Sequence, residues 1–399
     1  MLPMKERMRV RLFGCGKIAK EFYSNYKDHV IIEGAISNNP KEKIFSPQEG
    51  CDIEVERPEA KEKGKDSSLI ILCSMAYQEI AEQLMLLGYE PFKDFIDYEM
   101  AEILIYEKEI CLFYGFCHMR GIKEYMEGIR EVKEKYTLCF TPNYLKLSFY
   151  QQWMLNFLVK NCHVFIYGMA VSQEYHRKNE AILSRLDKAV KKVCVPAVYF
   201  SGYFPQEDRP FNRFVKYGIK SEGHDYSPFT YDDGWLNDCI EREMDDDAVI
   251  EYLLHTELWP KEKVQKNLEK EIGRLKYQDK LCDFSIAEYI EEHYDKVRLF
   301  RNEAHMENGL LKLYVSQLLE QLDIQAIVPD VTESLLKCSE HPIYPFVASA
   351  LDLKWDVLAE PLELYTYQGW RTITFEEYIK AYLFYSRQVK KMRGMALLP

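Results

Sequence analysis

A cysteine and a histidine, Cys117 and His305, are the side chains of this sequence best placed to do chemistry. Cys117 stands in the segment Gly-Phe-Cys-His, between an apolar run typical of a buried strand and a run with helical periodicity. The amides at a helix start stabilise negative charge, so a nucleophilic thiolate would be favoured there if the sulfur is not buried among apolar groups. A core cysteine beside a tight turn explains the same spacing equally well.

His305 is the residue that we expect to act as a base. The surrounding sequence predicts a strand through Phe300, a loop that holds His305, and a helix capped by Asn308. A helix terminus disfavours the protonated imidazole, so a neutral His305 could accept a proton. His118, next to Cys117, competes for this role, but neighbouring side chains on one chain usually diverge. A structural hydrogen bond is the alternative for a lone histidine.

A glycine-rich turn near the start of the chain could bind a nucleotide. The segment Gly-Cys-Gly-Lys-Ile-Ala, with its glycines at Gly14 and Gly16, matches G-x-G-x-x-A after a strand and before a helix. The acidic residue expected at the end of the second strand is replaced by Ser37, so we do not expect hydride transfer with NAD. Nucleotide or nucleotide-sugar binding stays open, as does a purely structural role in tight strand–helix packing.

A second region that could contact a ligand follows the apolar strand VPAVYF. Gly202 and Tyr203 stand there before a proline, which indicates a constrained turn at a strand end. The basic residues of the next segment are Arg209, Arg213, Lys216 and Lys220. Such a patch in an acidic protein could meet phosphates, whereas a solvated surface stretch is the commoner explanation.

Strands that alternate with helices must position these residues. The chain begins with a strand, a glycine turn and a helix, and two further buried strands follow near residues 30–40 and 69–73. This order predicts an α/β fold with an N-terminal Rossmann-like parallel sheet. A new strand–turn–helix and then a helix-rich section follow. We therefore predict a domain of residues 1–108 and a larger α/β domain of residues 109–399.

Composition limits the class of function. A chain of 399 residues with 47% hydrophobic residues can fill two cores. The formal charge of −12 and the pI near 5.4 argue against a general attraction to nucleic acid or anionic lipid. The eleven cysteines show no CxxC pair and no zinc spacing, so we expect reduced core thiols and no metal. No signal peptide or membrane span is evident, so we expect a cytoplasmic protein.

At these residues the C-terminal part resembles the WcbI-like family of polysaccharide biosynthesis proteins, regarded as acetyltransferases that bind coenzyme A. Three short motifs carry the resemblance: a Gly-x-Cys-polar turn from Gly115, a Gly-aromatic-Pro turn from Gly202, and His-x-x-Asn from His305 to Asn308. The family's usual Asn before the cysteine is Phe116 here, its usual Gln after the cysteine is a histidine, and its His-Pro pair is a His-Met pair. The N-terminal part separately resembles small nucleotide-binding domains found on sugar-modifying acyltransferases.

The resemblance implies an acyltransferase that uses acetyl-coenzyme A to modify a saccharide or nucleotide-linked saccharide in capsular or surface polysaccharide biosynthesis. His305 would act as general base, either on the sugar hydroxyl or on Cys117 to form an acyl-enzyme. The sequence does not choose between these routes. The residues that we expect to contact coenzyme A are Gly115, Arg120, Gly202, Tyr203, Arg209, Arg213 and Asn308.

Two other functions fit the same sequence. A strand–turn–helix nucleophile with a late histidine also suits an SGNH-like carbohydrate esterase. A non-catalytic protein that binds a sugar nucleotide through its N-terminal glycines is the alternative from a different class. An assembly of identical chains is left open.

Overall fold

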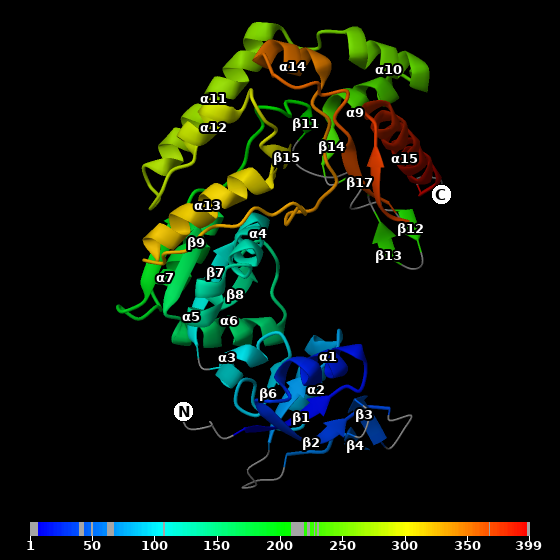
Figure 1. The fold of residues 1–399 in the computed structure, drawn as a ribbon. Helices are drawn as coiled ribbons and strands as arrows, with labels where there is room; N and C mark the ends of the chain where they lie inside the picture. Colours follow the sequence, from blue (N-terminus) through cyan, green and yellow to red (C-terminus); the bar gives the residue numbers. More distant parts are fainter. Residues whose placement is uncertain are drawn as a thin grey trace. The chain divides into compact units, whose positions relative to one another are not determined.

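A computed structural model gives the fold of the chain (Figure 1). It describes residues 7–39, 44–48, 51–61, 68–106, 108–208, 219–221, 224–226, 228–229, 231–366 and 368–396. The chain divides into two compact units that interleave along the sequence. Unit 1 comprises residues 1–114, 130–166 and 172–192, and unit 2 comprises residues 115–129, 167–171 and 193–399. Each unit is therefore built from three separate stretches of the sequence.

The N-terminal part of unit 1 is a six-stranded sheet in the order β3-β4-β2-β1-β5-β6. Its strands are β1 (Met8–Phe13), β2 (Val30–Ile36), β3 (Ile44–Gln48), β4 (Cys51–Glu56), β5 (Leu69–Leu72) and β6 (Phe95–Asp97). The pairs are parallel except for β3 with β4. Helices α1 (Lys17–Tyr26), α2 (Tyr77–Leu86) and α3 (Ala101–Tyr106) follow β1, β5 and β6. The predicted α/β class with a Rossmann-like parallel sheet is confirmed.

Apolar side chains on this sheet explain why these strands form. Phe13, Ile36, Leu72 and Phe95 come from four strands and belong to one buried cluster. Each such side chain contributes roughly 1.5–3 kcal/mol when it leaves water. Tyr150 completes the cluster, and its hydroxyl lies 2.9 Å from the carboxylate of Asp97.

A second sheet has the order β10-β9-β7-β8. Its strands are β7 (Glu109–Gly115), β8 (Tyr136–Pro142), β9 (Val164–Gly168) and β10 (Lys191–Val195). The intervening helices are α4 (Cys117–Met126), α5 (Arg130–Lys135), α6 (Phe149–Asn161) and α7 (Gln173–Leu183). Every residue of β7 after its first is buried, which is typical of a strand covered on both faces.

The C-terminal part of unit 2 is rich in helices, as predicted. They are α9 (Gly234–Glu241), α10 (Asp246–His255), α11 (Lys261–Asp279), α12 (Ala287–His293), α13 (Asn308–Gln321), α14 (Pro345–Leu351) and α15 (Phe375–Ala396). Four strand pairs lie among them: β11 (Glu207–Asp208) with β14 (Asp232–Asp233), β12 (Ile219–Ser221) with β13 (His224–Tyr226), β15 (Phe300–Asn302) with β16 (His305–Met306), and β17 (Leu362–Thr366) with β18 (Gly369–Ile373). Within the described ranges, no helix has the length and apolar character needed to cross a membrane.

Candidate active site

The short hairpin of β15 and β16 fixes the orientation of His305. The fully buried Asn302 accepts hydrogen bonds through Oδ1 from the backbone amides of Ala304 and His305, both at 3.0 Å. The same oxygen lies 2.9 Å from Nδ1 of His305. Because an amide oxygen can only accept, Nδ1 carries the proton and Nε2 keeps its lone pair. His305 thus lies in a short strand, where the sequence predicted a loop, and its imidazole is arranged as a base.

Cys117 is the first residue of α4 and is partly buried. The backbone amides of Cys117 and His118 are directed at its sulfur and favour the thiolate. Burial outweighs them and raises the pKa of the thiol to about 11. Burial thus acts against the thiolate that the start of the helix would favour.

His118 lies on the buried side of α4, with only 1% of its surface exposed. Its Nε2 has no hydrogen-bond partner among the described residues. Burial, and then the charge of the neighbouring His305, lower its pKa to about 3. Helix α4 packs against α13 and β16, which brings Cys117, His118 and His305 into one region of unit 2.

A third buried histidine, His341, joins this region and was missed from the sequence. It is completely buried, and its Nδ1 lies 3.1 Å from Oε1 of Glu207. Burial lowers its pKa to about 4, although the carboxylate of Asp233 acts in the opposite direction. Tyr231 stacks edge-on against His341 with ring centroids 5.6 Å apart, and it also interacts with Cys117. The His-Pro pair at positions 341 and 342 was the available signal.

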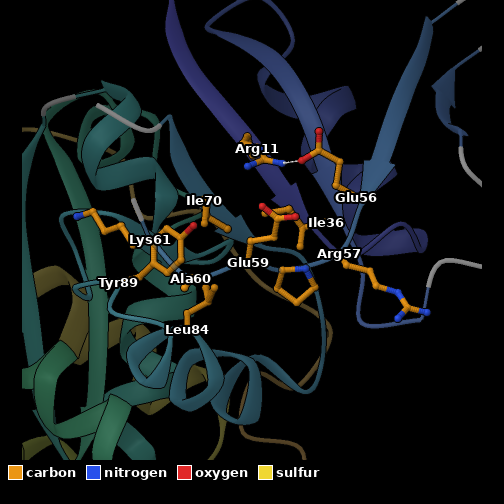
Figure 2. A pocket seen from close by; sticks show the side chains of 11 residues that line it. Arg11, Ile36, Glu56, Arg57, Glu59, Ala60, Lys61, Ile70, Leu84 and Tyr89 are labelled. Atoms are coloured by element: carbon orange, nitrogen blue, oxygen red, sulfur yellow. Dashed lines mark hydrogen bonds and ion pairs between the residues drawn. The ribbon is translucent and has the colours of Figure 1, made fainter. Parts of the chain in front are cut away.

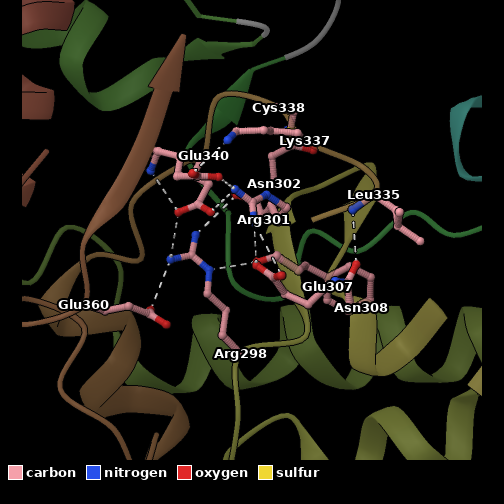
Figure 3. Close-up of polar contacts among 12 residues, drawn as sticks. Arg298, Arg301, Asn302, Glu307, Asn308, Leu335, Lys337, Cys338, Glu340 and Glu360 are labelled. Carbon is pink, nitrogen blue, oxygen red and sulfur yellow. Dashed lines mark hydrogen bonds and ion pairs between the residues drawn. The ribbon is translucent and has the colours of Figure 1, made fainter. Parts of the chain in front are cut away.

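An ion-pair network of arginines and glutamates fixes the hairpin of β15 and β16 (Figure 3). Arg301 is 5% exposed, pairs with Glu340 and lies 2.5 Å from Glu363. Arg298 lies 3.1 Å from Glu360. Removing one partner of such a buried pair typically costs about 3–5 kcal/mol, so the network holds β15 rigidly. Burial, and then the charge of Arg301, lower the pKa of His305 to about 4.

Some residues predicted to contact coenzyme A pack within the protein. Tyr203 is buried, and its hydroxyl donates to the carbonyl oxygen of Tyr294 at 2.5 Å. A Cβ atom at Gly202 would lie 2.5 Å from the ring of Phe200. A Cβ atom at Gly115 would lie 2.7 Å from the side chain of Met119. These two glycines are thus required by close packing.

The other predicted contacts lie elsewhere. Asn308 is the first residue of α13 and not its cap, because Glu307 occupies that position. Its side chain instead fastens the segment of residues 331–335, donating to two carbonyl oxygens at 2.8 Å and accepting from the amide of Leu335 (Figure 3). Arg120 is exposed and lies 2.7 Å from Glu124 on the same helix. Arg209 and Arg213 lie outside the described residues.

In unit 1 the two glycines of the predicted nucleotide turn differ in how much space surrounds them. Gly14 has a φ of +117°, and a Cβ atom there would lie 2.5 Å from the carbonyl oxygen of Cys73, so only glycine fits. Gly16 has open space around it, at the start of α1. A cavity of about 220 Å³ lies elsewhere in this unit, over Ile36 and Ile70, and neither glycine lines it (Figure 2).

Across the part of the chain that the structure describes, no group of three or more histidine, cysteine, aspartate or glutamate side chains is arranged to hold a metal ion. The candidate site brings together histidines held in their neutral form, a thiol and the start of α4.

Comparisons with known proteins point to the same part of the chain. The model of a known family, the polysaccharide biosynthesis enzyme WcbI, matches residues 110–326, which is more than half of the sequence. Among solved structures, the fold is similar to that of WcbI, which is described as a novel polysaccharide biosynthesis enzyme. That structure is of the native WcbI protein without a disulfide bond between coenzyme A and one of its cysteines. The identity is 14% and the TM-score 0.56, over 70% of this chain and 90% of that one.

Aspartate semialdehyde dehydrogenase II from Vibrio cholerae, complexed with ASA, also matches, with 11% identity over 48% of this chain and 87% of that one. Its TM-score of 0.17 carries no structural argument. No curated protein matches this chain.

Proposed function

Because this chain belongs to the WcbI family of polysaccharide biosynthesis enzymes, we propose that it transfers an acyl group from acyl-coenzyme A to a saccharide. The acceptor is a saccharide or nucleotide-linked saccharide destined for a capsule or other surface polysaccharide, and the reaction takes place in the cytoplasm. The observation that carries the proposal is the fixed imidazole of His305, whose Nδ1 faces Asn302 and whose Nε2 is left to accept a proton.

His305 acts directly on the acceptor. Its Nε2 takes the proton of the sugar hydroxyl as the oxygen attacks the thioester, and it then returns a proton to the departing sulfur. The direct route is favoured over an acyl-enzyme because burial keeps Cys117 protonated, with a pKa of about 11. The start of α4 favours negative charge, which suits the charge that develops on the carbonyl oxygen.

Cys117 is proposed to lie beside the thiol of coenzyme A. The similar WcbI structure is described with reference to a disulfide between coenzyme A and one of its cysteines. In this chain Cys117 is partly exposed at the start of α4, in the region that also holds His118 and His305. A thiol in this position would form a mixed disulfide with coenzyme A under oxidising conditions.

Calorimetric titration of the full chain with coenzyme A tests the proposal. We expect saturable binding by the wild type and by Cys117→Ala, because the cofactor is not held through that sulfur. Treatment with the symmetrical disulfide of coenzyme A should then label the wild type and Cys51→Ala, which keeps Cys117, but should not label Cys117→Ala at this site. A folded full chain that does not bind coenzyme A would contradict the proposal.

A further inference from the structure

Two cysteines that are distant in sequence lie close together in unit 2. Cys194, in β10, and Cys282, in the turn after α11, are 88 positions apart, and their sulfur atoms are separated by 3.9 Å. Both side chains are partly buried, so small reagents can reach them. The proposed acyl transfer uses neither thiol.

Two hydrogen bonds join the backbone at Cys194 to Asp283, the residue next to Cys282. The amide of Cys194 donates to the carboxylate of Asp283 at 2.5 Å, and the amide of Asp283 donates to the carbonyl oxygen of Cys194 at 2.9 Å. Asp279 closes the same turn by accepting from the amides of Ile286 and Ala287. The short distance between the sulfurs is therefore set by the fold.

The two thiols are not equivalent. Hydrogen bonds, first from Cys282 and then from the hydroxyl of Tyr167, lower the pKa of Cys194 despite burial. The same hydrogen bond to Cys194, together with burial, raises the pKa of Cys282. Cys194 is thus the thiol that ionises first, which is the attacking group in thiol–disulfide exchange.

We propose that Cys194 and Cys282 form a reversible disulfide by exchange with a small-molecule disulfide. A disulfide bond is about 2.05 Å long, so the two sulfur atoms, now 3.9 Å apart, need to approach by about 2 Å. The thiolate of Cys194 attacks one sulfur of the small disulfide and releases one thiolate. Cys282 then loses its proton and attacks the sulfur of Cys194, which releases the second thiolate. The protein is oxidised by two electrons, and the small disulfide is reduced to two thiols.

The bond joins the end of β10 to the turn between α11 and α12. This crosslink constrains the unfolded chain across a long loop, so the oxidised protein should unfold at a higher temperature than the reduced protein. The proposal is independent of the acyl transfer proposed above, because its test requires no turnover.

The test exposes the full chain to oxidised glutathione, blocks the remaining thiols in denaturant and maps the peptides by mass spectrometry. We expect an intramolecular disulfide between Cys194 and Cys282, a mass lower by two hydrogen atoms, and reversal by a reducing thiol. Both Cys194→Ser and Cys282→Ser should lose it; Cys282→Ser should keep a glutathione adduct on Cys194, whereas Cys194→Ser should leave Cys282 unmodified because the attacking thiol is gone. Cys51→Ser, which alters another partly exposed thiol, should still form it.

Two results would overturn the proposal. One is that both thiols stay available for blocking after oxidation has modified Cys51. The other is that either cysteine pairs with a different residue or with a second chain. Both results are obtained from the wild type, so the proposal is tested even where a serine variant does not fold.

Discussion

Acidification should destabilise unit 2 because three of its histidines, the buried His118 and His341 and the partly buried His305, are held in their neutral form. The pKa values of His118, His305 and His341 are lowered to about 3, 4 and 4 by burial. In the unfolded chain a histidine has a pKa of about 6.5. Between these values the unfolded state binds more protons than the folded state, so the free energy of unfolding falls as the pH falls from 6.5 towards 4.

The size of this fall in the free energy of unfolding follows from the pKa values. Between pH 7 and pH 5 each histidine lowers the free energy of unfolding by about 1.8 kcal/mol, or about 5.5 kcal/mol together. Asp233 acts in the opposite direction, because burial raises its pKa to about 6. Its protonation in the folded state returns about 1.3 kcal/mol over the same interval. Burial also raises the pKa values of Glu340 and Asp279, which act in the same direction as Asp233, so the net expected loss is less than about 4 kcal/mol.

The assay is guanidinium unfolding followed by tryptophan fluorescence, since four of the five tryptophans lie in unit 2. His341→Gln should remove about one third of the histidine contribution to the pH dependence. His255→Gln, which alters a histidine whose side chain is 71% exposed, is the control variant. A free energy of unfolding that stays constant from pH 7 to pH 5, or the same slope in His341→Gln, would refute the reasoning.

Three further predictions concern the site and the fold. Because His305 has a pKa near 4, the turnover rate should stay constant from pH 8 to about 5.5 and fall only near pH 4. A histidine base with an ordinary pKa would lose half its activity near pH 6.5. A pH–rate profile distinguishes these two outcomes. Asn302→Ala should lower turnover by about 10- to 100-fold, because the imidazole of His305 loses the side chain that orients it. Steady-state kinetics measures this, and an unchanged kcat in a folded variant would contradict it. Gly14→Ala should destabilise unit 1 by about 1–3 kcal/mol and Gly16→Ala much less, measured by thermal unfolding; equal effects would contradict the packing argument.

Local sequence patterns predicted the three central strands of the N-terminal sheet, β1, β2 and β5, but not β3, β4 and β6. The runs that become β1, β2 and β5 are short, apolar and followed by turns or helices, and such patterns report a buried parallel strand without knowledge of distant contacts. The turn that carries Cys117 at the start of α4 was found in the same way, because it lies between a strand and a helix in sequence.

Features set by distant contacts could not be predicted in this way. His341 and Glu207 meet across more than 130 positions, and neither stands in a periodic run. Asn308 has the residue type and position of a helix cap, yet its side chain binds the segment of residues 331–335, which the fold brings to it. The raised pKa of Cys117 likewise depends on burial, which the helix-start pattern does not report.

The central claim is that His305 is the base of a direct acyl transfer, and turnover of acetyl-coenzyme A tests it most directly. The full chain is supplied with acetyl-coenzyme A and a panel of sugars and nucleotide-linked sugars, and acetylated product is measured by mass spectrometry. The account predicts product from the wild type and from Cys117→Ala, and a rate lower by about 10²- to 10⁴-fold in His305→Ala. Equal rates in the wild type and His305→Ala, or complete loss of product in a folded Cys117→Ala, would contradict it.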